Sequence, residues 1–485
     1  MKAGAVLAVI ALYFVILFVV SALSGRRRNS PLSSVFFDGG RQSPWWVVAI
    51  SMIGSSISGV TFVSVPGMVE ASQFSYMQMV LGFIAGYAVV AYVLLPLYYR
   101  YNLTTIYAYL EDRFGTVGRK TGALFFVVSK FLGCGVRMFL TASVLQLFLF
   151  DPLGIPFAVN AAVTMLVVWG YSRRGGVKTL VWVDMLQTLA MIGAVVLCLY
   201  YIARSLGLDF GGLVRTVVSS PDSRIWFFDD PLDRRYFWKQ FLAGAFTVVA
   251  MTGLDQDMMQ KNLSCRNLRE ARRNVMSYGV AFVPVNLLFL ALGILLLSFR
   301  NSCGITIDGP DNLFPTIATQ YMGAGVGILF ILGLTAAGFS SAGSALTSLT
   351  SSVTLDLLRA DRKYGTEGLD RICKRVHSGV AVAMGLAIFG FSALKGSSVI
   401  DAVYTIAGYT YGPLLGMFIF GMTSRLEPSR KLLPAVCVAA PLITFILDHN
   451  SERWFGGYQM GFEVLLVNAA ITMLGLLIVS RRPRT

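Results

Sequence analysis

One apolar stretch of the chain carries a row of small hydroxyl side chains. Within GLTAAGFSSAGSALTSLTSS, Ala337, Ser340, Ser341 and Ser344 are spaced i, i+3, i+4 and i+7, so a helix would place them on one face. Polar groups are costly in hydrocarbon, and hydroxyl or carbonyl oxygens suit a dehydrated alkali cation better than zinc or copper. Two interpretations follow. The face is either a cation site or a small-residue surface that lets a neighbouring helix approach closely.

A second candidate for chemistry is Arg137, which lies in the middle of the apolar run FLGCGVRMFLTASVLQLF. A guanidinium in that position costs at least about a few kcal/mol unless it is paired or hydrated. Its planar fork fits a carboxylate at two points, so a ligand carboxylate is one expected partner. The other is an acid on a neighbouring helix, and Asp184 and Asp255 are the apolar-segment acids in question. We expect Lys130, nearer the inner surface, to extend its ammonium toward water.

These residues must be positioned by membrane-spanning helices. The chain has 485 residues, of which 55% are hydrophobic and 13% charged, and its mean hydropathy is +0.67. This composition predicts an all-α polytopic membrane protein and excludes an ordinary soluble domain. About 13 apolar segments are long enough to span a bilayer. They lie at 4–24, 44–67, 76–99, 121–150, 153–171, 178–203, 238–260, 274–298, 324–357, 376–394, 398–422, 432–448 and 460–480.

The distribution of basic residues predicts the orientation. With the N-terminus outside, about 28 of the 40 lysines and arginines fall in loops on the inner side or in the tail. The net charge of +15 is therefore a topology signal and not a nucleic-acid surface. The first apolar segment is followed, not preceded, by Arg26 to Arg28, so we interpret it as a retained helix and not a signal peptide. We expect an integral protein of the bacterial inner (cell) membrane, with its C-terminus in the cytoplasm.

Other chemistries have little support in the sequence. Of the six cysteines only Cys303 falls in an outer loop, so no disulfide is expected. His377 and His449 sit at opposite ends of different spans and are predicted to be interfacial. No metal-ligand cluster, catalytic dyad or Walker A motif is visible, which argues against an enzyme or an ATP-driven pump. A transporter-like sensor would carry an appended signalling domain, and the chain ends at Thr485.

Two spans are interrupted by small residues. SMIGSSISGVTFVSVPG contains Gly54, Gly59 and Pro66, and a second interruption lies at Gly244 to Gly253. Broken helices at corresponding places in two halves point to a midplane substrate site of a secondary transporter. We therefore predict one transmembrane domain, 1–485, built as a five-plus-five inverted repeat. Its parts are a leading helix (4–24), two five-helix repeats (44–203 and 238–422) and two C-terminal helices (432–480), with a surface helix or lid in the outer loop 204–237.

The chain resembles the sodium:solute symporters, which share the inverted-repeat fold of the bacterial leucine transporter. The resemblance extends from about Phe36 to Arg425. It rests on TTIYAYLEDRFG (104–115), GGVKTLVWVDMLQT (175–188), DQDMMQKNLSCRNLREA (255–271), AAGFSSAGS (336–344) and GYTYGPLLGMF (408–418).

This resemblance implies one sodium ion held between the break of the first core helix and the eighth core helix. Its ligands would be the carbonyls of Gly54, Ile57 and Ala337 and the hydroxyls of Ser340 and Ser341. The alternative is that Gly54 only relieves packing.

Some members of the family hold a second sodium ion. Here Asp184, Ser340 and Ser344 match its ligands, whereas Gly343 stands where such members carry Ser or Thr. That difference removes one ligand. Asp184 could instead be a solvated cap near the inner end of its span, or could face Lys178.

The resemblance also suggests substrate contacts. SSISGVT is similar to the unwound segment of the sialic-acid members, so Ser56, Ser58 and Thr61 would contact the substrate. Arg137 matches the arginine that grips the carboxylate there. Sugar-binding members carry Glu-Gln where this chain has Val60-Thr61, which argues against a galactose-type pocket.

The remaining polar and aromatic candidates have weaker signals. The set Asp255, Gln256, Gln260 and Lys261 is expected to cap and gate the inner end of the sixth core helix. The set Tyr404, Tyr409 and Tyr411 could line the pocket or close an outer gate, although aromatic residues at helical spacing more often serve packing.

Taken together, these features predict a sodium-coupled symporter that imports a small polar solute by alternating access. The expected solute carries a carboxylate, as a sugar acid or another monocarboxylate does. The alternative is a sodium symporter for a neutral sugar or polyol. The expected partners are sodium, the solute and the lipid bilayer, with no nucleic acid. The sequence does not indicate an oligomeric state, and this function does not require more than one copy of the chain.

Overall fold

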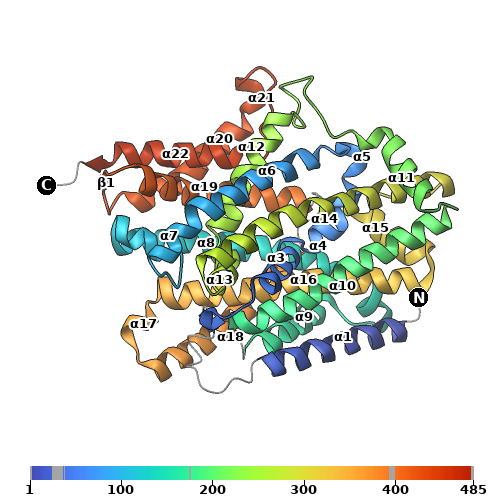
Figure 1. The fold of residues 1–485 in the computed structure, drawn as a ribbon, viewed down its shortest axis with the longest axis horizontal. Helices are drawn as coiled ribbons and strands as arrows, with labels where there is room; N and C mark the ends of the chain where they lie inside the picture. Colours follow the sequence, from blue (N-terminus) through green and yellow to red (C-terminus); the bar gives the residue numbers. More distant parts are fainter. Residues whose placement is uncertain (1–2, 25–35, 38, 174–175, 393–398, 482–485) are drawn as a thin grey trace.

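The computed structural model describes residues 3–24, 36–37, 39–173, 176–392 and 399–481 (Figure 1). Within them the chain is mostly helical, as the composition predicted. The only strand pair among these residues is the short antiparallel β1 (Glu427–Pro428) and β2 (Ser480–Arg481). Among the basic residues used to predict the orientation, Arg26 to Arg28, Arg174, Arg482 and Arg484 lie outside the described residues.

Seven helices in the described part of the chain are long and apolar enough to cross a membrane, and the count is eight if one bent pair is a single span. The predicted number of about 13 includes shorter apolar helices that lie at the expected places. These are α1 (Ala3–Ser24), α9 (Phe157–Ser172), α20 (Leu433–His449) and α22 (Val464–Ile478). The polytopic helical class is confirmed, and the full number of spans stays a prediction.

The first predicted repeat contains a broken first helix followed by four further helical spans. The break divides α3 from α4, and the two segments are bent by 58°. Ile57 (φ −82°, ψ 89°) and Ser58 (φ −83°, ψ 175°) leave the helical conformation at this point. The elements are α3 (Trp45–Ser56), α4 (Gly59–Gly67), α5 (Val69–Ser72), α6 (Tyr76–Val89), α7 (Leu95–Arg100), α8 (Ala108–Leu145), α9, and α10 (Gly176–Ser205).

The second predicted repeat also begins with a broken helix. A π-helical segment, η6 (Val249–Gly253), leads to the non-helical Leu254. The helix begins again at Gln256, with Asp255 as its N-cap. The interruption therefore lies directly after the predicted Gly244–Gly253 region. The elements are α12 (Phe237–Val248), α13 (Gln256–Asn262), α14 (Leu268–Cys303), α15 (Leu313–Thr316), α16 (Gly323–Ser352), α17 (Ala360–Lys363), α18 (Thr366–Phe391) and α19 (Val399–Thr423). This order agrees with five helices per half, while the symmetry between the halves stays a prediction.

The hydroxyl-bearing helix α16 lies at the centre of the bundle. In its most apolar 18-residue window 67% of the residues are buried, against 28% in the peripheral α18. It packs against α10, α8, α3 and α4. Figure 1 shows α1 and α18 along one side of the molecule and α20 and α22 along the opposite side. The polar face of α16 is therefore enclosed by protein and not by lipid.

Three features away from the broken helices bear on the sequence predictions. The segment 204–237 contains a surface helix, α11 (Phe210–Ser219), as expected. The prediction that His377 is interfacial is wrong, because its side chain is 2% exposed. Its ring nitrogens hydrogen-bond to Ser172 Oγ (3.1 Å) and Thr350 Oγ1 (3.0 Å), since α18 packs against both α9 and α16. All six cysteines are free thiols, and only Cys303 is exposed.

Candidate functional site

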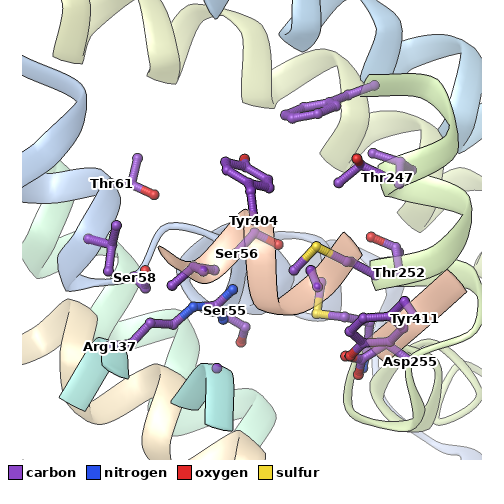
Figure 2. Close-up of a pocket in the computed structure, with 18 of the residues that line it drawn as sticks. Ser55, Ser56, Ser58, Thr61, Arg137, Thr247, Thr252, Asp255, Tyr404 and Tyr411 are labelled. Carbon is purple, nitrogen blue, oxygen red and sulfur yellow. The ribbon is translucent and has the colours of Figure 1, made fainter. Parts of the chain in front are cut away.

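A cavity of about 110 Å³ lies where the two broken helices meet (Figure 2). All four predicted substrate residues line it, namely Ser56, Ser58 and Thr61 at the α3–α4 break and Arg137 on α8. The opposite wall is formed around the second break, by Thr247, Thr252 and Asp255. Further lining comes from Tyr76, Phe83, Tyr87, Tyr278, Phe282, Tyr404 and Tyr411. The structure thus brings the predicted contacts together from helices far apart in the sequence.

Arg137 enters this cavity without an acidic partner. In Figure 2 its side chain extends from α8 toward the residues of the α3–α4 break. Its Nε is buried and has no hydrogen-bond partner. None of the ion pairs formed among the described residues includes Arg137. The alternative expectation, a buried pair with an acid on another helix, is therefore not what the structure shows.

Lys130, two helical turns before Arg137 on α8, neutralises the nearby acids instead. Its Nζ lies 3.1 Å from Asp255 Oδ2 and 2.7 Å from Asp257 Oδ2, and its side chain is only 11% exposed. The prediction that Lys130 extends toward water is wrong, because the break of the second broken helix brings two carboxylates to it. Tyr411 also donates a hydrogen bond to Asp255.

Asp255 has a structural role as well, as predicted. Its Oδ1 accepts hydrogen bonds from the backbone N–H groups of Asp257 (2.8 Å) and Met258 (3.3 Å), so it caps the N-terminus of α13. Asp255 is thus engaged by two backbone N–H groups, Lys130 and Tyr411. It forms no ion pair with Arg137 among the described residues.

The hydroxyl groups of the break fall into two sets. Ser56 hydrogen-bonds to Tyr278, which also accepts a hydrogen bond from Tyr87 (2.7 Å). By contrast, the hydroxyls of Ser58 and Thr61 form no hydrogen bond with the described residues, although both side chains are at least nine-tenths buried. These two hydroxyls are available to a ligand in the cavity.

The three candidate tyrosines separate in the structure. Tyr404 and Tyr411 line the cavity, and Tyr404 hydrogen-bonds to Tyr76 across it (3.1 Å). Tyr409 instead points away from the cavity and donates to Asp448 on α20. Its role is therefore packing between α19 and α20. Tyr76, Tyr87 and Tyr278 carry no signal in the sequence that distinguishes them, because aromatic residues in apolar helices usually serve packing.

The five residues predicted to hold sodium lie on elements that pack against one another. Ala337, Ser340 and Ser341 are buried on α16, which contacts both α3 and α4. At the break, the Ser58 N–H donates to the Ser56 carbonyl (3.1 Å) and not to the Gly54 carbonyl that a continuous helix would use. The Gly54 carbonyl is thereby released for another partner. This arrangement suits a cation site, and the assignment of these ligands stays a prediction.

Gly54 has a packing role in addition. A Cβ at this position would overlap the Thr188 hydroxyl on α10, since α3 and α10 approach closely here. The two interpretations of Gly54, a sodium ligand and a packing residue, are therefore compatible. The Gly54 carbonyl would bind the ion, and the absence of a side chain at Gly54 lets α10 approach closely.

Asp184 lies at the centre of a buried cluster of charged and hydroxyl groups. Its side chain is fully buried, so it is not a solvated cap, and its cationic partner is Lys261, not Lys178. Lys261 Nζ lies 2.5 Å from Asp184 Oδ2, while Ser340 Oγ donates to Oδ1 (3.0 Å) and Ser344 Oγ to Oδ2 (2.9 Å). We refer to these residues together with Ser55 as the Asp184 cluster. Lys261 was predicted to belong to an inner cap, and its pairing with Asp184 was not predicted from the sequence.

The structure also gives a physical reason for Gly343. A Cβ there would overlap the hydroxyl of Tyr171, which donates to the Phe339 carbonyl of α16 (2.6 Å). A Ser or Thr side chain at 343 would collide with this tyrosine. The glycine and the tyrosine together fill the position that a further hydroxyl ligand would occupy.

Comparison with curated proteins finds similar transporters. The chain is 26% identical over 402 residues to the human sodium/iodide cotransporter, covering 80% of this chain and 60% of that protein. It is 27% identical over 426 residues to the zebrafish (Danio rerio) sodium-coupled monocarboxylate transporter 2, covering 84% and 67%. It is 26% identical over 405 residues to the human sodium-coupled monocarboxylate transporter 1, covering 80% and 64%. The chain thus spans roughly two thirds or less of the length of these relatives.

Solved structures agree on the fold. A Na⁺-coupled sialic acid symporter in its substrate-bound outward-open state matches with a TM-score of 0.82 at 20% identity, over 98% of this chain and 99% of that one. A nucleobase-cation-symport-1 family transporter in a closed conformation matches with a TM-score of 0.52 at 13% identity, over 92% and 94%. The sodium:solute symporter family itself matches residues 36–427, most of the chain and nearly the range over which the motifs pointed to it. The chain belongs to the sodium:solute symporter family, a family of membrane transporters and not of enzymes.

Proposed function

We propose that this protein is a sodium-coupled symporter that imports a small monocarboxylate by alternating access. The observation that carries the proposal is the unpartnered guanidinium of Arg137 in a cavity between two broken helices. The Arg137 side chain is partly buried with its Nε enclosed, and a charge held there without a counter-ion is unfavourable, so a ligand carboxylate would supply a partner that the chain itself does not. The adjacent free hydroxyls of Ser58 and Thr61 would fix its orientation.

The charges of the site support an anionic ligand carried together with a cation. Lys130 is shared between two carboxylates, whereas Arg137 remains without one. A monovalent anion on Arg137 and one sodium ion at Gly54, Ile57, Ala337, Ser340 and Ser341 would add no net charge. The membrane potential would then act on the empty and loaded forms alike. A chemical sodium gradient would provide the driving force for uptake.

The relatives favour the same ligand charge. The names of the similar proteins give iodide, monocarboxylates and sialic acid as transported or bound solutes, and each of these is a monovalent anion or an acid. We propose the same orientation that the basic residues predict, with the N-terminus outside and one transmembrane unit comprising both repeats.

The test is uptake of radiolabelled short monocarboxylates into proteoliposomes under an inward sodium gradient. Arg137→Lys keeps the charge but loses the planar two-point fit. Loss of such a charge-assisted pair costs about 1.5–3 kcal/mol, which raises the half-saturating substrate concentration roughly ten- to hundredfold. Lys120→Gln, an exposed cation on the same helix α8, is the matched control and should leave uptake unchanged.

Neutral amides of the same acids complete the experiment. Wild type should bind the acid far better than its amide, and the Arg137→Lys variant should discriminate less. Equal affinity of wild type for acid and amide would contradict the carboxylate clamp. It would instead favour the alternative substrate class, a neutral sugar or polyol, with Arg137 serving another role.

A further inference from the structure

The Asp184 cluster joins four helices through one buried ion pair. Ser55 comes from the end of α3, Asp184 from α10, Lys261 from α13, and the two serines Ser340 and Ser344 from α16. Both charged side chains are at most 2% exposed. Lys261 Nζ contacts the Ser55 hydroxyl as well as Asp184 Oδ2. The ammonium is therefore surrounded by oxygen atoms.

The oxygens around the ammonium are those that a sodium ion would use. A carboxylate and several hydroxyls are hard donors suited to an alkali cation. Ser55 Oγ and Ser344 Oγ lie 3.5 Å apart, and both are within hydrogen-bond distance of Asp184 Oδ2 (3.3 and 2.9 Å). A cation at this place would have to displace the Lys261 ammonium, because two positive charges cannot share one carboxylate at such short range.

We infer that Lys261 is a tethered cation that occupies the cation position of the Asp184 cluster and excludes a second sodium ion. This inference rests on the proposed sodium coupling and sets its stoichiometry at one ion per cycle. It differs from a second sodium at Asp184, Ser340 and Ser344, the alternative that the sequence left open. Gly343 also disfavours a second sodium ion, since Tyr171 fills the space that the side chain of a further ligand would need.

The tethered cation also explains how Ser340 serves the first sodium site. Its hydroxyl proton is donated to Asp184 Oδ1, so its lone pairs face away from the carboxylate and are free for a cation. Lys261 neutralises Asp184 through Oδ2 and leaves Oδ1 to accept the hydrogen bond from Ser340. Asp184 is thus a positioning residue for the first sodium ion and not a ligand of a second one.

The deciding experiment measures equilibrium binding of ²²Na⁺ to the purified full-length protein in choline buffer, without substrate. Wild type should bind one sodium ion per chain. Lys261→Ala vacates the cluster and should bind two, whereas the double variant Lys261→Ala/Asp184→Asn lacks the carboxylate and should return to one. Lys178→Ala removes a cation from the same helix as Asp184 but outside the cluster, and it should bind one.

A stability measurement separates the charge from the space it fills. Lys261→Ala leaves a buried carboxylate without a counter-ion, so its melting temperature should fall in sodium-free buffer and recover as sodium is added. Lys261→Met removes the charge but retains the volume, so sodium should restore much less of its stability. The double variant should need no added sodium to regain stability.

The outcomes distinguish the inference from the proposed function. Two sodium ions bound to wild type, or no more sodium bound to Lys261→Ala than to the double variant, would overturn the tethered cation. If Lys261→Ala does not fold even in sodium, the number of sodium ions bound to wild type decides. One bound ion supports the inference, and two bound ions overturn it. No sodium bound to wild type would instead overturn the first sodium site. The inference would then still be tested by whether Lys261→Ala binds more sodium than the double variant.

Discussion

Ser340 and Ser341 are adjacent hydroxyls on α16 with different partners inside the protein. Ser340 donates to Asp184, whereas the Ser341 hydroxyl forms no hydrogen bond with the described residues. A change at Ser340 therefore disturbs the Asp184 cluster as well as any bound ion. A change at Ser341 removes only a potential ligand, which makes it the cleaner test of the first sodium site.

We expect Ser341→Ala to raise the sodium concentration for half-maximal uptake about tenfold, because one interaction with a cation is worth about 1.5 kcal/mol. Its melting temperature in sodium-free buffer should equal that of wild type. Ser348→Ala, two turns further along α16, removes a hydroxyl bonded only to its own helix at Ala345 and serves as the control. An unchanged sodium dependence in Ser341→Ala would remove Ser341 from the site.

At the scale of elements, the close approach of α3 and α10 holds the first break in place. This approach depends on Gly54, where a Cβ would overlap the hydroxyl of Thr188. Thr188 Oγ1 is itself within hydrogen-bond distance of the Ile50 carbonyl (3.0 Å) and the Asp184 carbonyl (2.7 Å), so it cannot move aside freely. The packing of these two helices thereby connects the break to the Asp184 cluster.

Gly54→Ala should therefore lower stability by about 1–3 kcal/mol, the usual cost of overfilling a packed interior. Thr188→Ala in the same chain should recover part of the loss, since it removes the overlapping hydroxyl. Thermal unfolding of the purified variants measures both effects. Gly193→Ala on α10, where a Cβ meets nothing within 4 Å, should be neutral or slightly stabilising. If Gly54→Ala unfolds like wild type, the close approach does not limit packing.

At the scale of the whole molecule, the orientation rests on the distribution of basic residues alone. The structure supplies an independent probe of it, because Cys303 at the end of α14 is exposed and the other five cysteines are buried. A membrane-impermeant maleimide should label Cys303 in intact cells if this end of α14 faces outward. Cys303→Ser should abolish the labelling. Labelling that requires permeabilised cells would invert the proposed orientation.

The whole molecule also separates the roles of three cationic side chains around the two broken helices, Lys130, Arg137 and Lys261. Lys130 and Lys261 each have acidic partners on the second broken helix or on α10. Arg137 has none among the described residues. Lys130 therefore holds the second break against α8, Lys261 closes the Asp184 cluster, and Arg137 is the cation that we propose binds the solute. The proposed function depends on this division more than on any single contact.

The sequence determined those features that depend on local spacing. The hydroxyl stripe of α16, the two broken spans and the surface helix at Phe210–Ser219 lie close to where the pattern predicted them. The motifs also identified the family, since short runs of residues at fixed spacing are visible without a fold. The four predicted substrate residues reach one cavity, because each belongs to an element that the family pattern already located.

Only the tertiary structure decided which buried charges meet. The sequence placed Lys130 in water and Lys261 in an inner cap, yet each pairs with carboxylates contributed by other helices. His377 likewise became buried through the packing of α18 against α9 and α16. Such partners are far apart in the chain, and the rotation and depth of each helix select them. No periodicity within one helix encodes that choice, because it arises only when the helices pack together.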